Sequence, residues 1–259
     1  MRLDVYLTQN NLADSRERAK RLILTGAVTL DGVVVKKPAL EVLGTPVVLV
    51  EEEDFVGRGG EKLRAALQYF RIDPKGLRAL DIGASTGGFT HCLLQNGASE
   101  VVALDAGCGQ LHPKLCSDCR VVNIEKYNAR TLSPDDVGTF DLVVMDVSFI
   151  SATYILPRFP LVMRPLAHAI VLIKPQFEAG RSALGKKGIV KHPKDRILAI
   201  ERVLTSASEV GLVCRGLAPS PIRGGDGNEE YLALFSMVGQ SAITPLSAQK
   251  AVLEGMVSK

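Results

Sequence analysis

The stretch LRALDIGASTGGFTHCLL, residues 77–94, decides the fold of this chain. An apolar strand ends at Asp81, a turn with Gly83, Gly87 and Gly88 follows, and an amphipathic helix begins directly after the turn. Glycines let a backbone approach a ligand closely, and the first turn of a helix offers unpaired N–H groups. The pattern therefore predicts a pocket of the nucleotide-binding kind at the end of this strand.

A second apolar strand, EVVALDAG, follows at residues 100–107 and ends at Asp105. An acid at the end of the second strand of a doubly wound sheet binds the hydroxyl groups of a ribose. The turn reads DxGxSxGGF, whereas a dinucleotide site has the spacing GxGxxG. Glycines that serve only close packing are the alternative, but the order of the two acids at strand ends favours a ligand site.

The glycine turn resembles the first motif of S-adenosylmethionine-dependent methyltransferases. The resemblance implies that the turn faces the methionine part of the cofactor S-adenosyl-L-methionine and that the second acid holds its ribose. Carried over to this sequence, it assigns cofactor contacts to Gly83, Ser85, Gly87 and Asp105. Asp81 is expected to orient backbone or the methionine amine, and the topology places Asn123 or Glu125 near the adenine.

Composition and charge are those of a globular α/β protein. The chain has 259 residues, 46% of them hydrophobic, which fits two unequal domains. Its longest apolar run, AIVLI, has the length of a strand, and MRLDVYLTQNN lacks the apolar core of a signal peptide, so we expect a cytoplasmic protein without a membrane segment. The net charge is only +3, yet basic residues cluster at 16–21 and 181–202. Such local clusters indicate a defined anionic partner.

The five cysteines are an odd number, which argues against a disulfide framework. Cys108, Cys116, Cys119 and His112 could supply four zinc ligands, but the usual paired spacing of a structural zinc site is missing. Free thiols beside a ligand pocket are the favoured interpretation, and no metal is expected.

The first 47 residues predict a small α+β unit. A short helix is followed by Asp14 or Ser15 as an N-cap, a second helix that ends at Gly26, and an Asp-Gly hairpin in VTLDGVVV. The patterns R-L-D-xx-L and S-R-xx-A-xx-L-I-xx-G-x-V closely resemble the S4 RNA-binding module. A basic helix face beside a basic hairpin presents phosphate-seeking groups, so we expect RNA contacts from Arg16, Arg18, Lys20, Arg21, Lys36 and Lys37. A solvated helix face is the alternative.

The remaining chain predicts a mostly parallel, seven-stranded Rossmann-like sheet covered on both faces. Helical patterns separate most of the apolar strands, and the last two strands, without a helix between them, suit an antiparallel edge. The acidic and glycine-rich stretch at residues 48–60 reads as a mobile connection. We therefore expect an S4-like domain with linker at residues 1–60 and a methyltransferase domain at residues 61–259.

Several further motifs, GGEKL, DLVVMDVSFIS, LIKPQFE and GNEEYL, lie behind the S4 module. Together with the glycine turn they resemble the TlyA (hemolysin A-like) family of ribosomal RNA 2′-O-methyltransferases, whose catalytic domain is of the FtsJ/RrmJ type. The resemblance covers about residues 1–240 and implies cytidine methylation. The family's Lys-Asp-Lys-Glu tetrad maps to Lys62, Asp146, Lys174 and Glu230, with the adjacent Glu229 as the alternative for the last position.

The tetrad predicts a way to activate a weakly nucleophilic ribose hydroxyl. Lys174 is expected to orient the hydroxyl and, if Lys62 and partial burial depress its pKa, to accept the proton. Asp146 is expected to hold Lys174 and the hydroxyl in register, while Lys62 steers the ribose or a phosphate and Glu230 orients a lysine. Each residue alone could be an ordinary surface charge or helix cap.

The segment QFEAGRSALGKKGIVKHPKDR, residues 176–196, is glycine-rich and basic. We expect a loop that guides RNA through Arg181, Lys186 and Lys187, with an ordinary surface loop as the alternative. The chain has no tryptophan and no aromatic cluster in sequence, so recognition is expected through phosphates and RNA shape.

The expected partners are ribosomal RNA or ribosomal subunits, with no membrane and no obligate protein partner. One rival hypothesis is an RNA-binding assembly factor that binds cofactor without useful catalysis; the intact lysines and aspartate argue against it. A membrane-active pore lacks support in the sequence, and the S4-like module disfavours a small-molecule methyltransferase.

Overall fold

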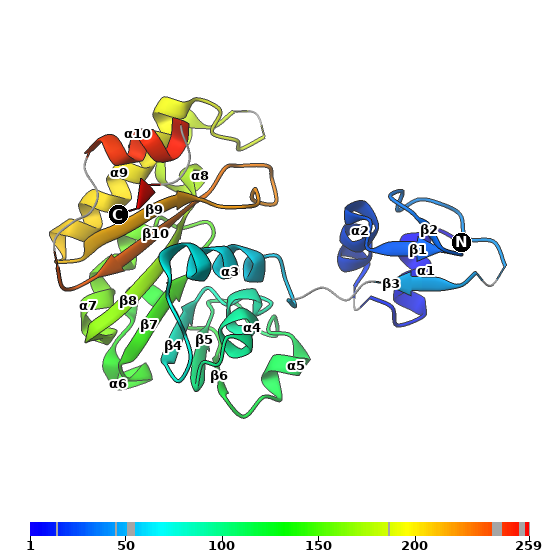
Figure 1. Cartoon of the computed structure of the whole chain (residues 1–259), viewed down its shortest axis with the longest axis horizontal. Helices are drawn as coiled ribbons and strands as arrows, with labels where there is room; N and C mark the ends of the chain where they lie inside the picture. The colour runs from blue at the N-terminus through cyan, green and yellow to red at the C-terminus, as the bar shows by residue number, and fades with distance from the viewer. Residues whose placement is uncertain are drawn as a thin grey trace. The chain divides into compact units, whose positions relative to one another are not determined.

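The computed structural model describes residues 1–13, 15–44, 46–50, 55–185, 187–239, 245–253 and 257–258. The chain divides into two compact units, Met1–Asp54 and Phe55–Lys259 (Figure 1). Each unit has its own apolar core, so we describe the two units separately.

The small unit packs two helices on a three-stranded antiparallel sheet of order β2-β1-β3. Its elements are α1 (Leu3–Gln9), α2 (Arg16–Thr25), β1 (Val28–Leu30), β2 (Val33–Val34) and β3 (Val48–Val50). The inner faces of both helices and of β1 form the core, which includes Leu3, Leu7, Ala19, Leu22, Ile23 and Val28. The amphipathic pattern of the sequence therefore gives the expected α+β unit.

The ends of α2 and the hairpin follow local sequence rules. Ser15 Oγ accepts a hydrogen bond from the backbone N–H of Arg18 and is the N-cap, while Asp14 lies outside the described residues. Gly26 ends the helix with φ 85°. Asp31 and Gly32 both have positive φ, 49° and 80°, which is typical of the tight hairpin turn that an Asp-Gly pair favours.

The large unit is built on one mixed sheet of order β11-β9-β10-β8-β7-β4-β5-β6. Its strands are β4 (Arg78–Ile82), β5 (Glu100–Leu104), β6 (Val121–Ile124), β7 (Phe140–Met145), β8 (Met163–Ile173), β9 (Val213–Pro219), β10 (Tyr231–Ser236) and β11 (Val257–Ser258). Strands β6, β5, β4, β7 and β8 are parallel neighbours, and β10 pairs antiparallel with both β8 and β9. The mostly parallel sheet of seven strands is therefore confirmed, and the two-residue β11 extends its edge.

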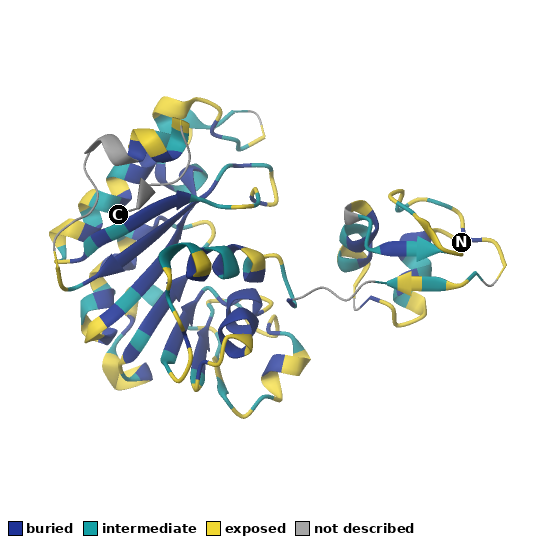
Figure 2. Ribbon diagram, in the orientation of Figure 1, coloured by how far each residue is buried: buried dark blue, intermediate teal, exposed yellow. Residues whose placement is uncertain are grey.

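Helices cover both faces of this sheet, as the apolar strands require (Figures 1 and 2). One face packs against α3 (Gly59–Phe70) and α4 (Gly88–Gln95), and the other packs against α9 (Pro193–Glu209) and α10 (Pro245–Leu253). Successive residues of a strand point to opposite faces, so Leu142 and Val144 contact the α3 side while Val143 and Met145 contact the α9 side. Four shorter helices lie in the connections: α5 (Pro113–Cys116), α6 (Pro134–Val137), α7 (Phe159–Val162) and α8 (Pro175–Glu178).

The strand order reverses between β4 and β7, because the chain first runs outward to β5 and β6 and then returns to the other side of β4. In open α/β sheets, ligands bind outside the carboxyl ends of the strands at this point of reversal. The glycine turn follows β4 there, and Asp146 follows β7. The fold therefore places the predicted site residues at the expected edge of the sheet.

The boundary between the units lies at Asp54/Phe55, slightly before the predicted boundary at residue 60. Phe55 is only 5% exposed and packs into the α3–α4 core of the large unit. The Phe55 ring packs edge-on against the His91 ring, with 5.9 Å between the ring centroids. The guanidinium carbon of Arg64 lies 5.0 Å from the centroid of the Phe55 ring. The end of the expected linker thus belongs to the large unit, because an aromatic side chain anchors it.

Truncating this anchor should destabilise the large unit alone. Phe55→Ala removes a buried aromatic side chain and should lower the free energy of unfolding by about 3 kcal/mol. Hydrogen exchange followed by mass spectrometry should show faster exchange in α3 and α4 and unchanged exchange in the small unit. Leu49→Ala, at a position 63% exposed in the small unit, is the control and should leave α3 and α4 unchanged.

Candidate active site

Four polar side chains meet at the carboxyl edge of the sheet. Lys62 lies in the first turns of α3, Asp146 directly follows β7, and Lys174 directly follows β8. Glu230 directly precedes β10, whose first residue is paired with the last residue of the antiparallel β8. This register brings Glu230 to the same edge as Lys174, although the two are far apart in sequence.

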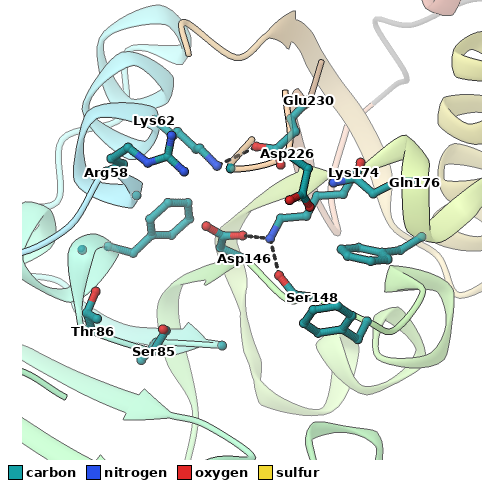
Figure 3. Close-up of a pocket in the computed structure, with 18 residues that line it drawn as sticks. Arg58, Lys62, Ser85, Thr86, Asp146, Ser148, Lys174, Gln176, Asp226 and Glu230 are labelled. Carbon is teal, nitrogen blue, oxygen red and sulfur yellow. Dashed lines mark hydrogen bonds and ion pairs between the residues drawn. The ribbon is translucent and has the colours of Figure 1, made fainter. Parts of the chain in front are cut away.

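The four side chains form two ion pairs (Figure 3). Lys62 Nζ lies 2.6 Å from Glu230 Oε2, and Lys174 Nζ lies 2.6 Å from Asp146 Oδ1. Lys174 also donates a hydrogen bond of 2.8 Å to Ser148 Oγ. Lys62, Lys174 and Glu230 are all buried, so each ammonium group requires the carboxylate beside it. Glu229 instead pairs with Arg196 and Arg223, which leaves Glu230 as the partner of Lys62.

These pairs border a cavity of about 310 Å³. Its wall includes all four residues of the two pairs, the glycine turn, and the side chains of Arg58, Gln176 and Asp226. Two lysines and an arginine against three acids give the cavity a mixed, strongly polar surface. Such a surface suits a polar substrate. The lysine–carboxylate pairs can position that substrate and exchange a proton with it.

A second cavity of about 370 Å³ adjoins the first. The two share Gly83, Ser85, Asp146, Ser148 and Phe149 as lining residues. Apolar side chains and an acid, Asp105, form much of the remaining wall, together with Tyr127 and Asn128; the apolar set is Ile82, Leu104, Val147, Ile150 and Ile155. A ligand with a flat apolar part and a hydroxylated part fits this lining.

Gly83 makes the close approach between β4 and β7 possible. Its φ is 83°, and a Cβ added there would lie 2.6 Å from the carbonyl oxygen of Asp146. Gly87, with φ 94°, has no room for a Cβ either, because Leu115 would lie 2.2 Å away. The glycines therefore fix the turn, and Gly87 supports it from behind rather than lining a cavity.

Two acids, Asp105 and Asp81, hydrogen-bond to the glycine turn and to the helix that follows it. Asp105 accepts hydrogen bonds from the backbone N–H groups of Ser85 at 2.8 Å and Gly107 at 2.7 Å. Asp81 is fully buried and accepts a bond of 2.7 Å from Thr90 Oγ1, but its Oδ1 has no partner among the described residues. Burial, together with the charges of Asp146 and Asp105, raises the pKa of Asp81 to about 7.

Asn123 lies outside both cavities. It is exposed on β6 and hydrogen-bonds to Glu125, which itself accepts a bond from the N–H of Gly109. Lys126, with φ 56°, turns the chain so that the N–H of Tyr127 bonds to the carbonyl of Asp105. The residues after this turn, not those on β6, therefore reach the second cavity. Strand topology alone could not locate this turn.

An aromatic pair at the cavities was missed by the sequence analysis. Phe149 is 92% exposed, has φ 64°, and lines both cavities. Its ring centroid lies 5.4 Å from that of Phe177. The rings come together only in the fold, so no cluster was visible in sequence. An exposed aromatic ring held in a strained backbone conformation is typical of a ligand contact.

The basic segment at residues 176–196 is more ordered than the predicted loop. It contains α8, a short 3₁₀ turn at Arg181–Ala183 and a bridge between Leu184 and Val190. The buried Asn228 holds it: Asn228 Oδ1 accepts from the N–H of Val190, and its amide donates to the carbonyl of Gly188. The segment is thus tied to the chain just before Glu230. Arg181 and Lys187 are exposed, and Lys186 lies outside the described residues.

The predicted RNA-contacting residues of the small unit have different surroundings. Lys36 and Lys37 are exposed after β2. Arg16 pairs at 3.0 Å with the buried Asp4, whose pKa falls to about 2 because Arg2 and Arg16 hydrogen-bond to it. Lys20 pairs with Glu17 at 3.1 Å. Arg18 and Arg21 are half-buried on the same helix, so the exposed charge lies mostly on Arg16 and on the hairpin.

The family of the chain follows from its match to known domains. The model of the FtsJ-like methyltransferase domain matches residues 55–237, which include strands β4 to β10 of the sheet and both ion pairs. The chain belongs to the FtsJ-like methyltransferase family. The S4 domain model matches residues 1–45, the small unit.

Relatives of this FtsJ-like methyltransferase align over more than nine-tenths of its length. It is 41% identical to the 16S/23S rRNA (cytidine-2′-O)-methyltransferase TlyA of Mycobacterium tuberculosis, over 97% of this chain and 95% of the relative. It is 40% identical to Hemolysin A of Brachyspira hyodysenteriae, over 91% of this chain and 99% of the relative. A solved structure from Streptococcus thermophilus, named as a candidate hemolysin, aligns with a TM-score of 0.78 at 38% identity and covers 97% of this chain and 94% of that one.

Two predicted absences concern metals and membranes. Within the described residues, no group of three His, Cys, Asp or Glu side chains is placed to hold a metal ion. Cys108, Cys116 and Cys119 are exposed thiols. No helix in the described part of the chain is long and apolar enough to span a membrane.

The buried Asp81 should make the stability of the enzyme depend on pH. Its folded pKa of about 7 lies above the value of about 3.9 in an unfolded chain, so the folded protein binds this proton more tightly. The contribution is therefore complete below about pH 4 and is lost as the pH rises to about 7. Asp81→Asn should flatten this part of the profile.

Urea unfolding between about pH 4 and about pH 8 measures this dependence. The control is Asp118→Asn, because Arg120 holds the pKa of folded Asp118 at about 2, so its contribution to stability is constant above about pH 5. An Asp81→Asn profile parallel to that of the wild type would contradict the assignment.

Proposed function

We propose that this protein transfers the methyl group of S-adenosyl-L-methionine to the 2′-oxygen of a cytidine ribose in ribosomal RNA. One observation carries the proposal: the cavity with two lysine–carboxylate pairs adjoins the cavity of the glycine turn, and Asp146 lines both. A methyl donor in one cavity and a hydroxyl in the other would meet at this shared wall.

The second cavity fits the cofactor. Asp81 is fully buried and lines neither cavity, so it would support the cofactor site only indirectly, through its hydrogen bond with Thr90 near the start of α4. Each carboxylate oxygen of Asp105 accepts one backbone hydrogen bond and can accept another. Asp105 would therefore accept hydrogen bonds from the ribose hydroxyls of the cofactor. The apolar wall near Ile155 would pack on adenine. When bound, S-adenosyl-L-methionine supplies an electrophilic methyl group on sulfur.

Lys174 is the proposed group that acts on the hydroxyl. Its Nζ is fixed between Asp146 and Ser148, so its position in the cavity is set by contacts of 2.6 and 2.8 Å. After the Lys174 ammonium has released one proton to solvent, its neutral amine would accept a hydrogen bond from the 2′-hydroxyl, orient the oxygen toward the shared wall and take up the hydroxyl proton as the oxygen gains the methyl group. Asp146 would keep the resulting ammonium in place by its negative charge.

The Lys62–Glu230 pair would position the substrate from the opposite side. Glu230 holds the ammonium of Lys62 at 2.6 Å, where it can contact the ribose or its phosphate. Gly224 allows this, because a Cβ there would lie 2.5 Å from Glu230 Oε1. The pair would therefore orient the target nucleotide, while the Lys174–Asp146 pair acts on its hydroxyl.

The name of the Mycobacterium tuberculosis relative supports ribosomal RNA as the substrate class. The S4 match at residues 1–45 supports RNA contacts by the small unit, in which Arg16, Lys36 and Lys37 are exposed. The basic segment with Arg181 and Lys187 would supply further phosphate contacts near the cavity. The cytosolic location stays a prediction from the sequence.

Removing the amine of Lys174 should abolish methyl transfer and spare cofactor binding. Lys174→Ala should lower kcat by at least about 100-fold, because a positioned acid–base group contributes that much or more. Isothermal titration with S-adenosyl-L-methionine should give a Kd within about twofold of the wild type, since Lys174 lines only the first cavity. Lys250→Ala, at an exposed position on α10, is the control with unchanged kcat. Wild-type activity of Lys174→Ala would sink the catalytic assignment.

The reaction itself is tested by transfer of labelled methyl to purified 30S and 50S subunits and to free rRNA. Incorporation at a cytidine 2′-oxygen would establish the reaction and the preferred substrate. No incorporation into any RNA despite measurable cofactor binding would favour the rival hypothesis, an RNA-binding assembly factor.

Phe149 should support the base of the target nucleotide. The ring is exposed beside both cavities, and a base stacked on an aromatic ring gains about 1–3 kcal/mol. Phe149→Ala should therefore raise KM for RNA about tenfold or more with little change in thermal stability, while Phe149→Tyr retains the wild-type KM. Leu166→Ala, at a position 78% exposed on β8, serves as the control. An unchanged KM for Phe149→Ala would refute the stacking role.

A further inference from the structure

A third hollow lies where α3 ends, away from both cavities of the site. It has a volume of about 670 Å³ and is lined by Gln68, Tyr69, Phe70, Arg71, Ile72, His168, Arg215 and Leu234. The α3 helix connects the two regions, because Lys62 near its start lines the first cavity and Arg71 follows its last turn. Nine residues of helix span about 14 Å along its axis.

The described residues that line the hollow carry a net positive charge. None of the described residues that line it is acidic, and two of them are arginines. Burial and the charge of Arg215 lower the pKa of His168, so His168 is a neutral hydrogen-bonding group and the arginines supply the charge. Gln68 and Tyr69 add further polar groups. The lining therefore matches an oxygen-rich anion.

The backbone around the hollow makes room for these side chains. A Cβ at Gly239 would lie 2.3 Å from the Arg215 guanidinium, and a Cβ at Gly216 would lie 2.6 Å from the Phe70 ring. The rings of Phe70 and Tyr69 pack edge-on, with 5.1 Å between their centroids. Both glycines thus leave space that the lining side chains Arg215 and Phe70 occupy.

Arg71 itself occupies a position where the backbone favours glycine. It follows the last turn of α3 with φ 56° and ψ 43°, the left-handed conformation in which helices end most readily on glycine. An arginine there is strained, and strained residues cluster at functional sites. A purely structural helix end would gain nothing from the long cationic side chain beyond its attraction to the helix dipole.

We propose that this hollow binds a backbone phosphate of the substrate RNA through Arg71 and Arg215. The inference rests on the proposed function, because it takes RNA as the substrate. A strand that enters the catalytic cavity would have a second, sequence-independent contact at the other end of α3. Guanidinium groups bind phosphate oxygens with two parallel hydrogen bonds, which suits this pair of side chains.

The sharpest test is Arg71→Gly in the full-length protein. Glycine relieves the left-handed strain, so the melting temperature should stay equal or rise, whereas the phosphate contact is lost. The Kd for purified ribosomal subunits and free rRNA, measured without cofactor, should weaken roughly tenfold, and the slope of log K against log salt should fall by about 0.7 to 1. Arg71→Lys should restore part of the affinity. Arg215→Glu should weaken binding at least as much as Arg71→Gly.

Lys75→Glu is the matched control, because Lys75 is an exposed cation of the same unit and lies outside the hollow. Arg71→Gly and Arg215→Glu proteins that bind RNA with the wild-type Kd and salt slope would overturn the inference. So would a Lys75→Glu protein that loses as much affinity as they do. A wild-type protein that binds no RNA would instead overturn the proposed function, so the two failures are distinguishable.

Discussion

The candidate active site depends on two ion pairs with buried lysines, Lys174–Asp146 and Lys62–Glu230. An ammonium group that leaves water without a partner loses several kilocalories per mole of hydration, so each lysine can be buried only with its carboxylate. The carboxylates are in place because of strand register. Asp146 follows β7, and the pairing of Tyr231 with Ile173 brings Glu230 to the same edge. A slip of one residue in β10 would turn Glu230 toward the opposite face.

Much of the fold follows from local patterns in the sequence. The apolar strands, the glycine turn and the final strand pair predict a parallel sheet with an antiparallel edge, because each signal lies within a few residues. The positions of Asp146 and Lys174 also follow from sequence, since a residue directly after a parallel strand lies at the site edge whatever the rest of the chain does. Only a resemblance to a family, however, relates these four residues to one reaction.

Other features depend on contacts between distant segments, and local patterns could not show them. Phe149 lies in the connection after β7 and Phe177 lies in α8 after β8, so the two rings meet only when β7 and β8 pair in parallel. Asn123 was expected near the cofactor because β6 ends there, but Tyr127 and Asn128, which follow the left-handed turn at Lys126, line the second cavity and Asn123 does not. The anchoring of Phe55 moves the domain boundary for the same reason, because burial of a ring is a tertiary property.

The wall shared by the two cavities has a consequence for inhibitor design. Asp146, Ser148 and Phe149 border both cavities, so only the side chains of this shared wall lie between a fragment bound in one cavity and a fragment bound in the other. A short covalent tether would make binding of the second fragment intramolecular, and the affinity of the joined compound would exceed that of either fragment by a large factor. A purine-like piece joined to a cationic or hydroxylated piece would match the two linings. Because the junction is built from this enzyme's own active-site loops, such a compound would select for the arrangement of both cavities at once.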